Sequence, residues 1–199
     1  MNPEEVLVIP ASGIALSRFT KDPEAIASVL NAVAAKGYFR LRKPDAENDP
    51  STRQIIPYIV VSEPSGRIFG TLRIAGGEPR LHGRISLGIG GNINPIDGID
   101  APIDALTAGM MREWNEEVSC SILPDFGAPI GVINDESDPV GRVHLGLVYV
   151  VHLDEQGMIA VRETDILEGR WFSISELQEN IDSLEGWAKI IVEGLYGTT

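Results

Sequence analysis

Three glutamates stand at helical spacing in the middle of the chain: Glu113, Glu116 and Glu117. Residues three and four apart share one face of an α-helix, so these carboxylates would project together within about one turn. Like charges at this spacing repel each other, and no Lys or Arg follows in the next turn to neutralise them. A divalent cation would remove the repulsion, and Mg²⁺ or Mn²⁺ prefers such oxygen ligands. The pattern therefore indicates a metal-binding helix face.

A helix has to carry these side chains, and the sequence predicts one over residues 102–118. Apolar residues recur at every fourth position and would form its buried stripe: Leu106, Met110, Trp114 and Val118. The glutamates lie off this stripe, on another side of the helix. We expect Asp100 to cap the helix, with Asp104 in its first turn as a favourable charge.

The rest of the chain mixes helical and strand patterns without strict alternation. Apolar periodicity predicts further helices over 21–36, 175–180 and 184–195. Runs rich in β-branched residues predict strands over 55–62, 67–74, 84–89, 128–134, 143–153 and 158–162. Residues 63–66 would close a hairpin and 45–52 a loop. This order favours an α+β fold with a mixed β-sheet between helices over a doubly wound parallel sheet.

Composition narrows the class of partner. The formal net charge is -13, which argues against a nucleic-acid polymer and against an anionic membrane surface. A small phosphorylated substrate stays possible, because a metal ion can supply positive charge locally. Cys120 is the only cysteine, so no intrachain disulfide can form. No apolar run reaches the length of a membrane span, and the first ten residues lack a basic signal region. We expect a cytoplasmic protein.

The run Arg112–Glu117, R-E-W-N-E-E, resembles the core of the Nudix hydrolase box, G-x5-E-x7-R-E-U-x-E-E-x-G-U, where U is a bulky aliphatic residue. Trp114 takes the first U position, Asp104 replaces a Glu, and Ser119 replaces the last Gly. Gly98 matches the box glycine by spacing. The pair Gly90-Gly91, at the end of a predicted strand, is the alternative, and the two assignments stay open together with any role of Asp104.

Sequence around the box extends the resemblance. Gln54–Tyr58 and Arg80–Asn94 are similar to a bacterial Nudix subgroup known only as predicted phosphoesterases, and Trp171–Leu177 follows the box as in the family. The resemblance implies a single domain over 1–199, with a helix-containing extension over 1–50 and a Nudix core over about 55–180. The expected architecture is a Nudix-type α/β/α sandwich. Homodimers are common in the family, so a homodimer is a further expectation.

The resemblance also implies an activity, the hydrolysis of a diphosphate linkage in a nucleotide-like or other phosphorylated small molecule. Mg²⁺ or Mn²⁺ would be held by Glu113, Glu116 and Glu117, with a backbone carbonyl near Gly90-Gly91. Arg112 would pair with Glu116 at i,i+4 and orient it.

Other roles are less constrained by the motif. A general base would come from a loop after the box, where Glu168 and Glu163 are candidates and Glu168 is preferred. Either could instead be a solvated surface residue. Substrate phosphates would meet arginines that lead into the Gly-Gly turn: Arg80, Arg73 and Arg84.

Two other functions share this fold. A non-catalytic module that binds a nucleotide-like ligand or a partner would not need the clustered acids, so the glutamates disfavour it. An isomerase of isopentenyl diphosphate uses a cysteine before the box in relatives, whereas Cys120 follows it.

Overall fold

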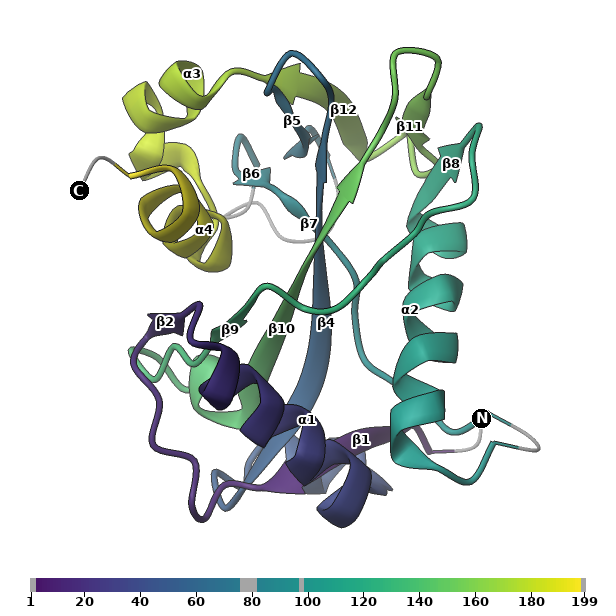
Figure 1. Ribbon diagram of the computed structural model, residues 1–199, viewed down its shortest axis with the longest axis vertical. Coiled ribbons are helices and arrows are strands. Elements are labelled where there is room, and N and C mark those ends of the chain that lie inside the picture. Colours follow the sequence, from purple (N-terminus) through teal and green to yellow (C-terminus); the bar gives the residue numbers. More distant parts are fainter. Residues whose placement is uncertain (1–2, 76–81, 97–98, 198–199) are drawn as a thin grey trace. The chain divides into compact units, whose positions relative to one another are not determined.

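The computed structural model describes residues 3–75, 82–96 and 99–197 (Figure 1). The chain forms two compact units, each built from three stretches of sequence. The first unit comprises Met1–Tyr58, Gly90–Glu113 and Pro129–Val148, and the second comprises Ile59–Ile89, Trp114–Ala128 and Tyr149–Thr199.

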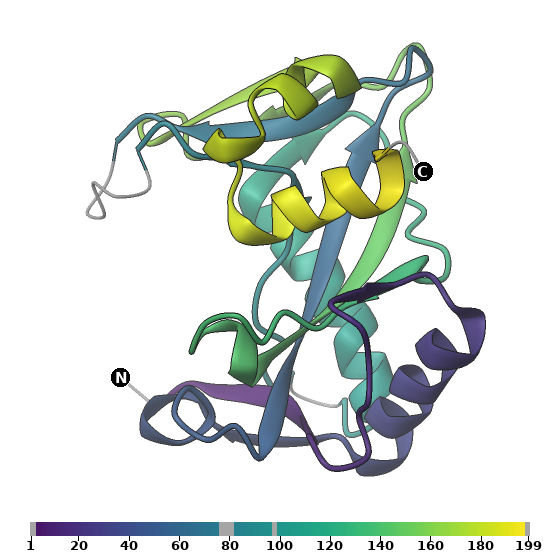
Figure 2. The same cartoon turned by 90° about the vertical axis from the view of Figure 1, so that its left-hand side faces the viewer.

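The first unit combines antiparallel strands with one complete helix and the first part of a second helix. β1 (Glu5–Pro10) pairs with β3 (Tyr38–Leu41) and with the start of β4 (Thr52–Ser62). β9 (Gly131–Ile133) pairs with β2 (Phe19–Thr20) and with β10 (His144–His152). α1 (Pro23–Lys36) packs against β1 and β9. In Figure 2, α1 is the dark purple helix. Short helical turns are η1 (Arg42–Ala46) and η3 (Gly141–Val143).

α1 confirms the first predicted helix, and its ends have clear causes. The Asp22 side chain accepts a hydrogen bond from the Glu24 amide, and Pro23 occupies the first turn, where its missing N–H costs nothing. The helix ends at Gly37, whose amide donates to Val33 O. A Cβ on Gly37 would lie 2.8 Å from the Cβ of Pro102, so close packing requires glycine there.

The second unit contains several strands of the ten-stranded sheet, a separate two-stranded sheet and the C-terminal helices. β5 (Ile68–Arg73) pairs with β12 (Leu167–Phe172), with β6 (Ile85–Ser86) and with the end of β4, which also pairs with β7 (Gly88–Ile89). β8 (Val118–Cys120) and β11 (Ile159–Val161) form a separate antiparallel pair. α3 (Ile174–Glu179) and α4 (Gly186–Tyr196) pack on each other, with the turn η4 (Ile181–Ser183) between them.

The predicted central helix is α2 (Pro102–Glu117), which passes from the first unit into the second at Trp114. All four residues of its predicted stripe are buried: Leu106, Met110, Trp114 and Val118. The Ala105 amide donates to Ala101 O at 3.0 Å, so Ala101 holds the cap position expected for Asp100.

Several predicted boundaries were wrong. Residues 84–89 form two strands, β6 and β7, because Leu87 turns into the core and the chain changes partner from β5 to β4. Within 128–134 only β9 is extended, and 45–52 contains part of η1 and the first residue of β4. The prediction also missed some strands altogether: β1, β2, β3, β8 and β12.

Candidate active site

Gly91 and Glu113 bring the strand end and α2 into contact within the first unit. A Cβ on Gly91 would lie 2.8 Å from Oε2 and 2.9 Å from Oε1 of Glu113, so that carboxylate rests on the glycine backbone. Gly90 adopts a φ of 145°, and a side chain there would collide with Pro57 O. These contacts place Gly91 in the position beside the box helix. Gly98 lies outside the described residues.

The Arg112 side chain is hydrogen-bonded to the loop that follows Gly91. Its Nη2 donates to Asn92 O at 2.7 Å, to Asn94 Oδ1 at 3.0 Å and to Glu113 Oε1 at 2.7 Å. The Glu113 side chain is 13% exposed and that of Arg112 is 31% exposed, so this ion pair is partly shielded from solvent. The expected pairing of Arg112 with Glu116 stays a prediction. Neither Asn92 nor Asn94 was predicted as a site residue, although both lie within three residues after the Gly-Gly pair.

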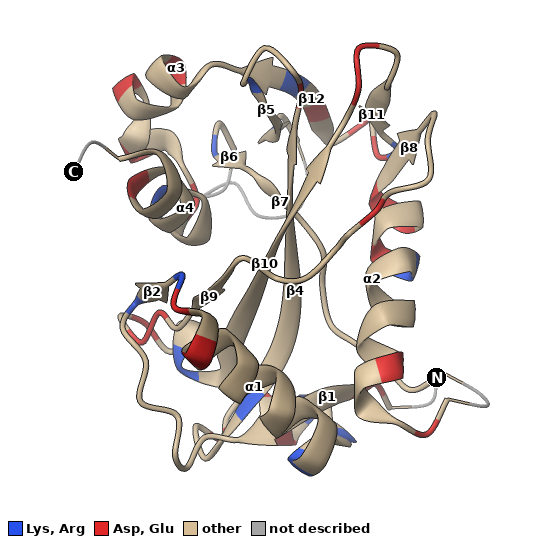
Figure 3. Cartoon of the chain, viewed as in Figure 1, with Lys and Arg blue, Asp and Glu red and all other residues tan. Residues whose placement is uncertain are grey.

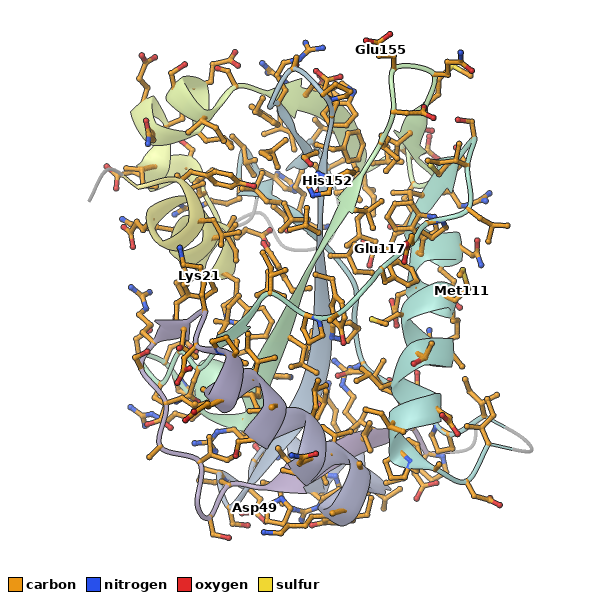
Figure 4. The ribbon with its side chains drawn as sticks, viewed as in Figure 1. Lys21, Asp49, Met111, Glu117, His152 and Glu155 are labelled. Carbon is orange, nitrogen blue, oxygen red and sulfur yellow. The ribbon has the colours of Figure 1, made fainter. Side chains whose placement is uncertain are left out.

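The last turn of α2, where Figure 3 shows acidic positions, is fixed within the second unit by Arg162. The Arg162 amide donates to Glu117 O at 2.8 Å, and its Nε donates to Val118 O at 2.9 Å. Glu116 is exposed and Glu117 half-buried. In Figure 4 the Glu117 side chain leaves α2 on a different side from Met111. Glu163, the neighbour of Arg162, is therefore anchored next to the end of the box helix.

The two candidate bases lie in different settings in the second unit. Glu163 is exposed in the loop before β12, and its carbonyl accepts from the Ile166 and Leu167 amides. Glu168 is exposed on β12, opposite Leu72.

Residues that face each other across antiparallel strands project to the same side of the sheet. Glu168 thus shares the face of Gly70, where a Cβ would contact Leu87. The opposite face carries Gly169, where a Cβ would contact Val161 of β11, the strand paired with β8. Glu168 therefore projects away from the strand that continues α2.

The arginines predicted to meet substrate also differ. Arg73 pairs with Leu167, so it projects on the face toward β11, and its buried Nε has no hydrogen-bond partner. Arg84 Nη1 donates to Asp182 O, which gives its side chain a structural contact. Arg80 lies outside the described residues.

No three His, Cys, Asp or Glu side chains among residues 3–75, 82–96 and 99–197 are gathered closely enough to hold a metal ion. The donor set on α2 nevertheless suits a hard cation, since it offers three carboxylates at i, i+3 and i+4. Gly91 has no side chain, so its backbone comes close to one of these carboxylates, that of Glu113. The chemistry of these residues fits Mg²⁺ or Mn²⁺. The glutamate side chains would have to rotate to bring their oxygens around one ion.

Comparison with known proteins first defines the class. No family model matches the chain. The crystal structure of DR0079 from Deinococcus radiodurans has the same fold, with a TM-score of 0.52, 16% identity, and coverage of 79% of this chain and 91% of that one. The α+β architecture with a mixed sheet and helices is confirmed.

Closer relatives then give the family. The crystal structure of Tm1382, a candidate Nudix hydrolase, matches with a TM-score of 0.78 and 32% identity over 96% of this chain and 98% of that one. Protein YmaB of Bacillus subtilis (strain 168) is 33% identical over 172 residues, which are 84% of this chain and 82% of YmaB. The chain belongs to the Nudix hydrolase family. It is a hydrolase that acts on phosphoric anhydride bonds, and its fold implies small phosphorylated substrates.

Within the described ranges, no helix combines the length and the apolar character needed to cross a membrane.

Proposed function

We propose that this Nudix hydrolase cleaves a diphosphate linkage in a nucleotide-like or other phosphorylated small molecule, and that it requires Mg²⁺ or Mn²⁺. The observation that carries the proposal is the seating of Glu113 against Gly91. This contact fixes one carboxylate of the box helix beside a glycine, where the backbone is not covered by a side chain of its own. Glu116 and Glu117 follow on the same helix at the spacing a metal site needs.

Glu113, Glu116 and Glu117 would hold the ion, together with a carbonyl of Gly90 or Gly91. Once bound, the ion would neutralise phosphate oxygens and lower the pKa of a bound water. Arg112 holds the Glu113 carboxylate in place through its Nη2. We assign Arg112 a positioning role rather than contact with substrate.

Glu163 is the better candidate for the general base. Its neighbour Arg162 is hydrogen-bonded to the backbone of Glu117, whereas Glu168 projects to the face of the sheet that carries Leu87. A base has to come within hydrogen-bonding reach of the attacking water. Arg73 is the better candidate for a substrate phosphate, because it projects on the side of β11 and its Nε lacks a partner.

The test is phosphate release from a panel of nucleotides, dinucleotides and nucleotide sugars with Mg²⁺ or Mn²⁺. We expect turnover that stops with EDTA and falls at least a hundredfold in Glu116→Gln and Glu117→Gln. Glu179→Gln is the matched control, because Glu179 is exposed on α3. Full activity of both box variants would refute the site assignment. Binding of substrates without any turnover would point to the non-catalytic module instead.

A further inference from the structure

We propose that Asn94 is a positioning residue, which links the N-terminal strand β1 to the Glu113 carboxylate through Arg112. The inference rests on the proposed metal site, since Glu113 is one of its expected ligands. Asn94 lies on the loop between β7 and α2, ahead of the R-E-W-N-E-E core of the Nudix box. Every contact in the chain of interactions lies within the first unit.

The Arg112–Glu113 contact needs an external cause. Adjacent residues on a helix project about 100° apart and do not normally face each other. Yet Arg112 Nη2 lies 2.7 Å from Glu113 Oε1. The same nitrogen also reaches Asn92 O and Asn94 Oδ1, both on the loop. These two acceptors draw the guanidinium around the helix toward the loop, which is also where Glu113 meets Gly91.

Asn94 can join Arg112 to β1 because both the oxygen and the nitrogen of its side-chain amide form hydrogen bonds. Its Oδ1 accepts from Arg112, while its Nδ2 donates to Glu5 O at 2.8 Å and to Glu4 Oε1 at 3.3 Å. A carboxylate could replace only the accepting half, and a methyl group could replace neither half. The planar side-chain amide of Asn94 therefore connects the Glu5 carbonyl of β1 to the Arg112 guanidinium.

The strand end of the link is firmly held. Val6, Leu7, Val8 and Ile9 of β1 are fully buried, and the Leu7 amide donates to Ile93 O at 2.7 Å. Glu4 is itself paired with Arg42, with Nη1 to Oε2 at 3.0 Å. Burial raises the pKa of Glu4, but the hydrogen bonds and charge of Arg42 and the Asn94 amide outweigh this and lower it. Glu4 is thus an ionised acceptor that favours an N–H donor at position 94.

The experiment compares three variants with the wild-type protein: Asn94→Ala, Asn94→Asp and the double variant Asn94→Asp/Glu4→Gln. Asn94→Ala removes both halves of the link. Asn94→Asp keeps an acceptor for Arg112 but repels Glu4. In the double variant, the amide introduced at position 4 can donate to the carboxylate introduced at position 94, which restores the contact with residue 4 but not the bond to Glu5 O. Asn31→Ala, at an exposed asparagine of α1, is the matched control.

Two measurements are made on each protein. The affinity for Mn²⁺ alone is measured by calorimetry, and hydrogen exchange at the Arg112 guanidinium is measured by NMR, with assignment from Arg112→Lys. We expect Asn94→Ala to weaken Mn²⁺ binding about tenfold, as loss of an outer support for a ligand commonly does, and to accelerate guanidinium exchange. Asn94→Asp should weaken binding by a smaller factor, and the double variant should recover part of that loss.

The outcomes separate this proposal from the proposed function. Wild-type protein that binds no Mn²⁺ would contradict the metal requirement, and the guanidinium exchange would then still decide the role of Asn94. Exchange in Asn94→Ala within twofold of wild type would overturn the link. A binding loss in Asn94→Asp that the second substitution fails to recover would exclude the Glu4 side chain from it.

Discussion

Glu113 and Gly91 lie so close together that one more carbon on the glycine would have to displace the Glu113 carboxylate. The nearest carboxylate oxygen would lie 2.8 Å from an added Cβ, below the separation that real side chains adopt. Gly91 does not have a positive φ, so the backbone itself would accept alanine. The requirement for glycine at this position therefore comes from the carboxylate.

Gly91→Ala tests that requirement with a single methyl group. We expect the methyl to push Glu113 off the glycine and to lower kcat/KM at least tenfold, which is about 1.4 kcal/mol of transition-state stabilisation. Steady-state hydrolysis of the best substrate from the panel measures the effect. The control is Gly186→Ala in the first turn of α4, where a Cβ would meet nothing within 4 Å. Wild-type activity in Gly91→Ala would mean that the Glu113 carboxylate has no fixed role.

Glu163 and Glu168 give opposite expectations for the general base. Glu163→Gln should lower kcat by about a hundredfold or more and remove the acidic limb of the pH–rate profile, because a glutamine cannot accept the proton. Glu168→Gln should keep most of the activity, since Glu168 projects on the face away from β11. A large loss of activity in Glu168→Gln, with little loss in Glu163→Gln, would reverse the assignment.

The helices were predictable from the sequence because their signals are local. The stripe ending at Val118 has a period that matches an α-helix, and α2 ends one residue before it. α3 begins one residue before the predicted 175–180, because Ser173 and Glu176 form a capping box at its start. β12 was missed because its residues alternate weakly between exposed and half-buried, and pairing with β5 creates the strand. In β1 the residues Val6–Ile9 form a short, buried apolar run. Periodicity alone cannot tell whether such a run is a strand or part of a buried helix.

The candidate site was predictable only where one helix defines it. The spacing of Glu113, Glu116 and Glu117 follows from α2 itself. Asn94 could not be identified in this way, because its contact with Glu5 joins residues 89 positions apart. The contact of Gly91 with Glu113 of α2 likewise could not be specified by sequence spacing, and the assignment of the box glycine to Gly91 or Gly98 stays a prediction.

Trp114 stands where the Nudix box has an aliphatic residue, and its burial predicts a stability effect. The indole is 2% exposed and meets Phe126 edge to face, with ring centroids 5.9 Å apart. Trp114→Ala should lower the free energy of unfolding by about 3–5 kcal/mol, and Trp114→Leu should cost less because it fills more of the space. Urea denaturation measures both. Asn115→Ala, at the exposed neighbouring position, should stay within about 0.5 kcal/mol of wild type.

His144 makes the first unit sensitive to mild acid. Burial lowers the pKa of His144 below 6.5, and the nearby Arg42 charge adds to this, although the hydrogen bond with Val140 O and the charges of Glu47 and Asp138 oppose it. The unfolded chain therefore takes up the proton at higher pH than the folded protein does. The stabilisation is fully present above about pH 6.5 and is lost as the pH falls through the lower, folded-state pKa.

We therefore expect the free energy of unfolding of the wild-type protein to decrease between pH 7.5 and pH 5.5. His144→Gln keeps a donor for Val140 O at 2.7 Å but cannot titrate, so its stability should change less over that range. Carboxyl groups titrate mainly at lower pH, near their ordinary values of about 4, so the difference between the two proteins isolates the histidine. Urea unfolding at pH 5.5, 6.5, 7.5 and 8.5 gives the two curves. Parallel curves would show that His144 does not produce the acid sensitivity, because an imidazole whose pKa is lowered by folding must make them diverge below its unfolded-state pKa.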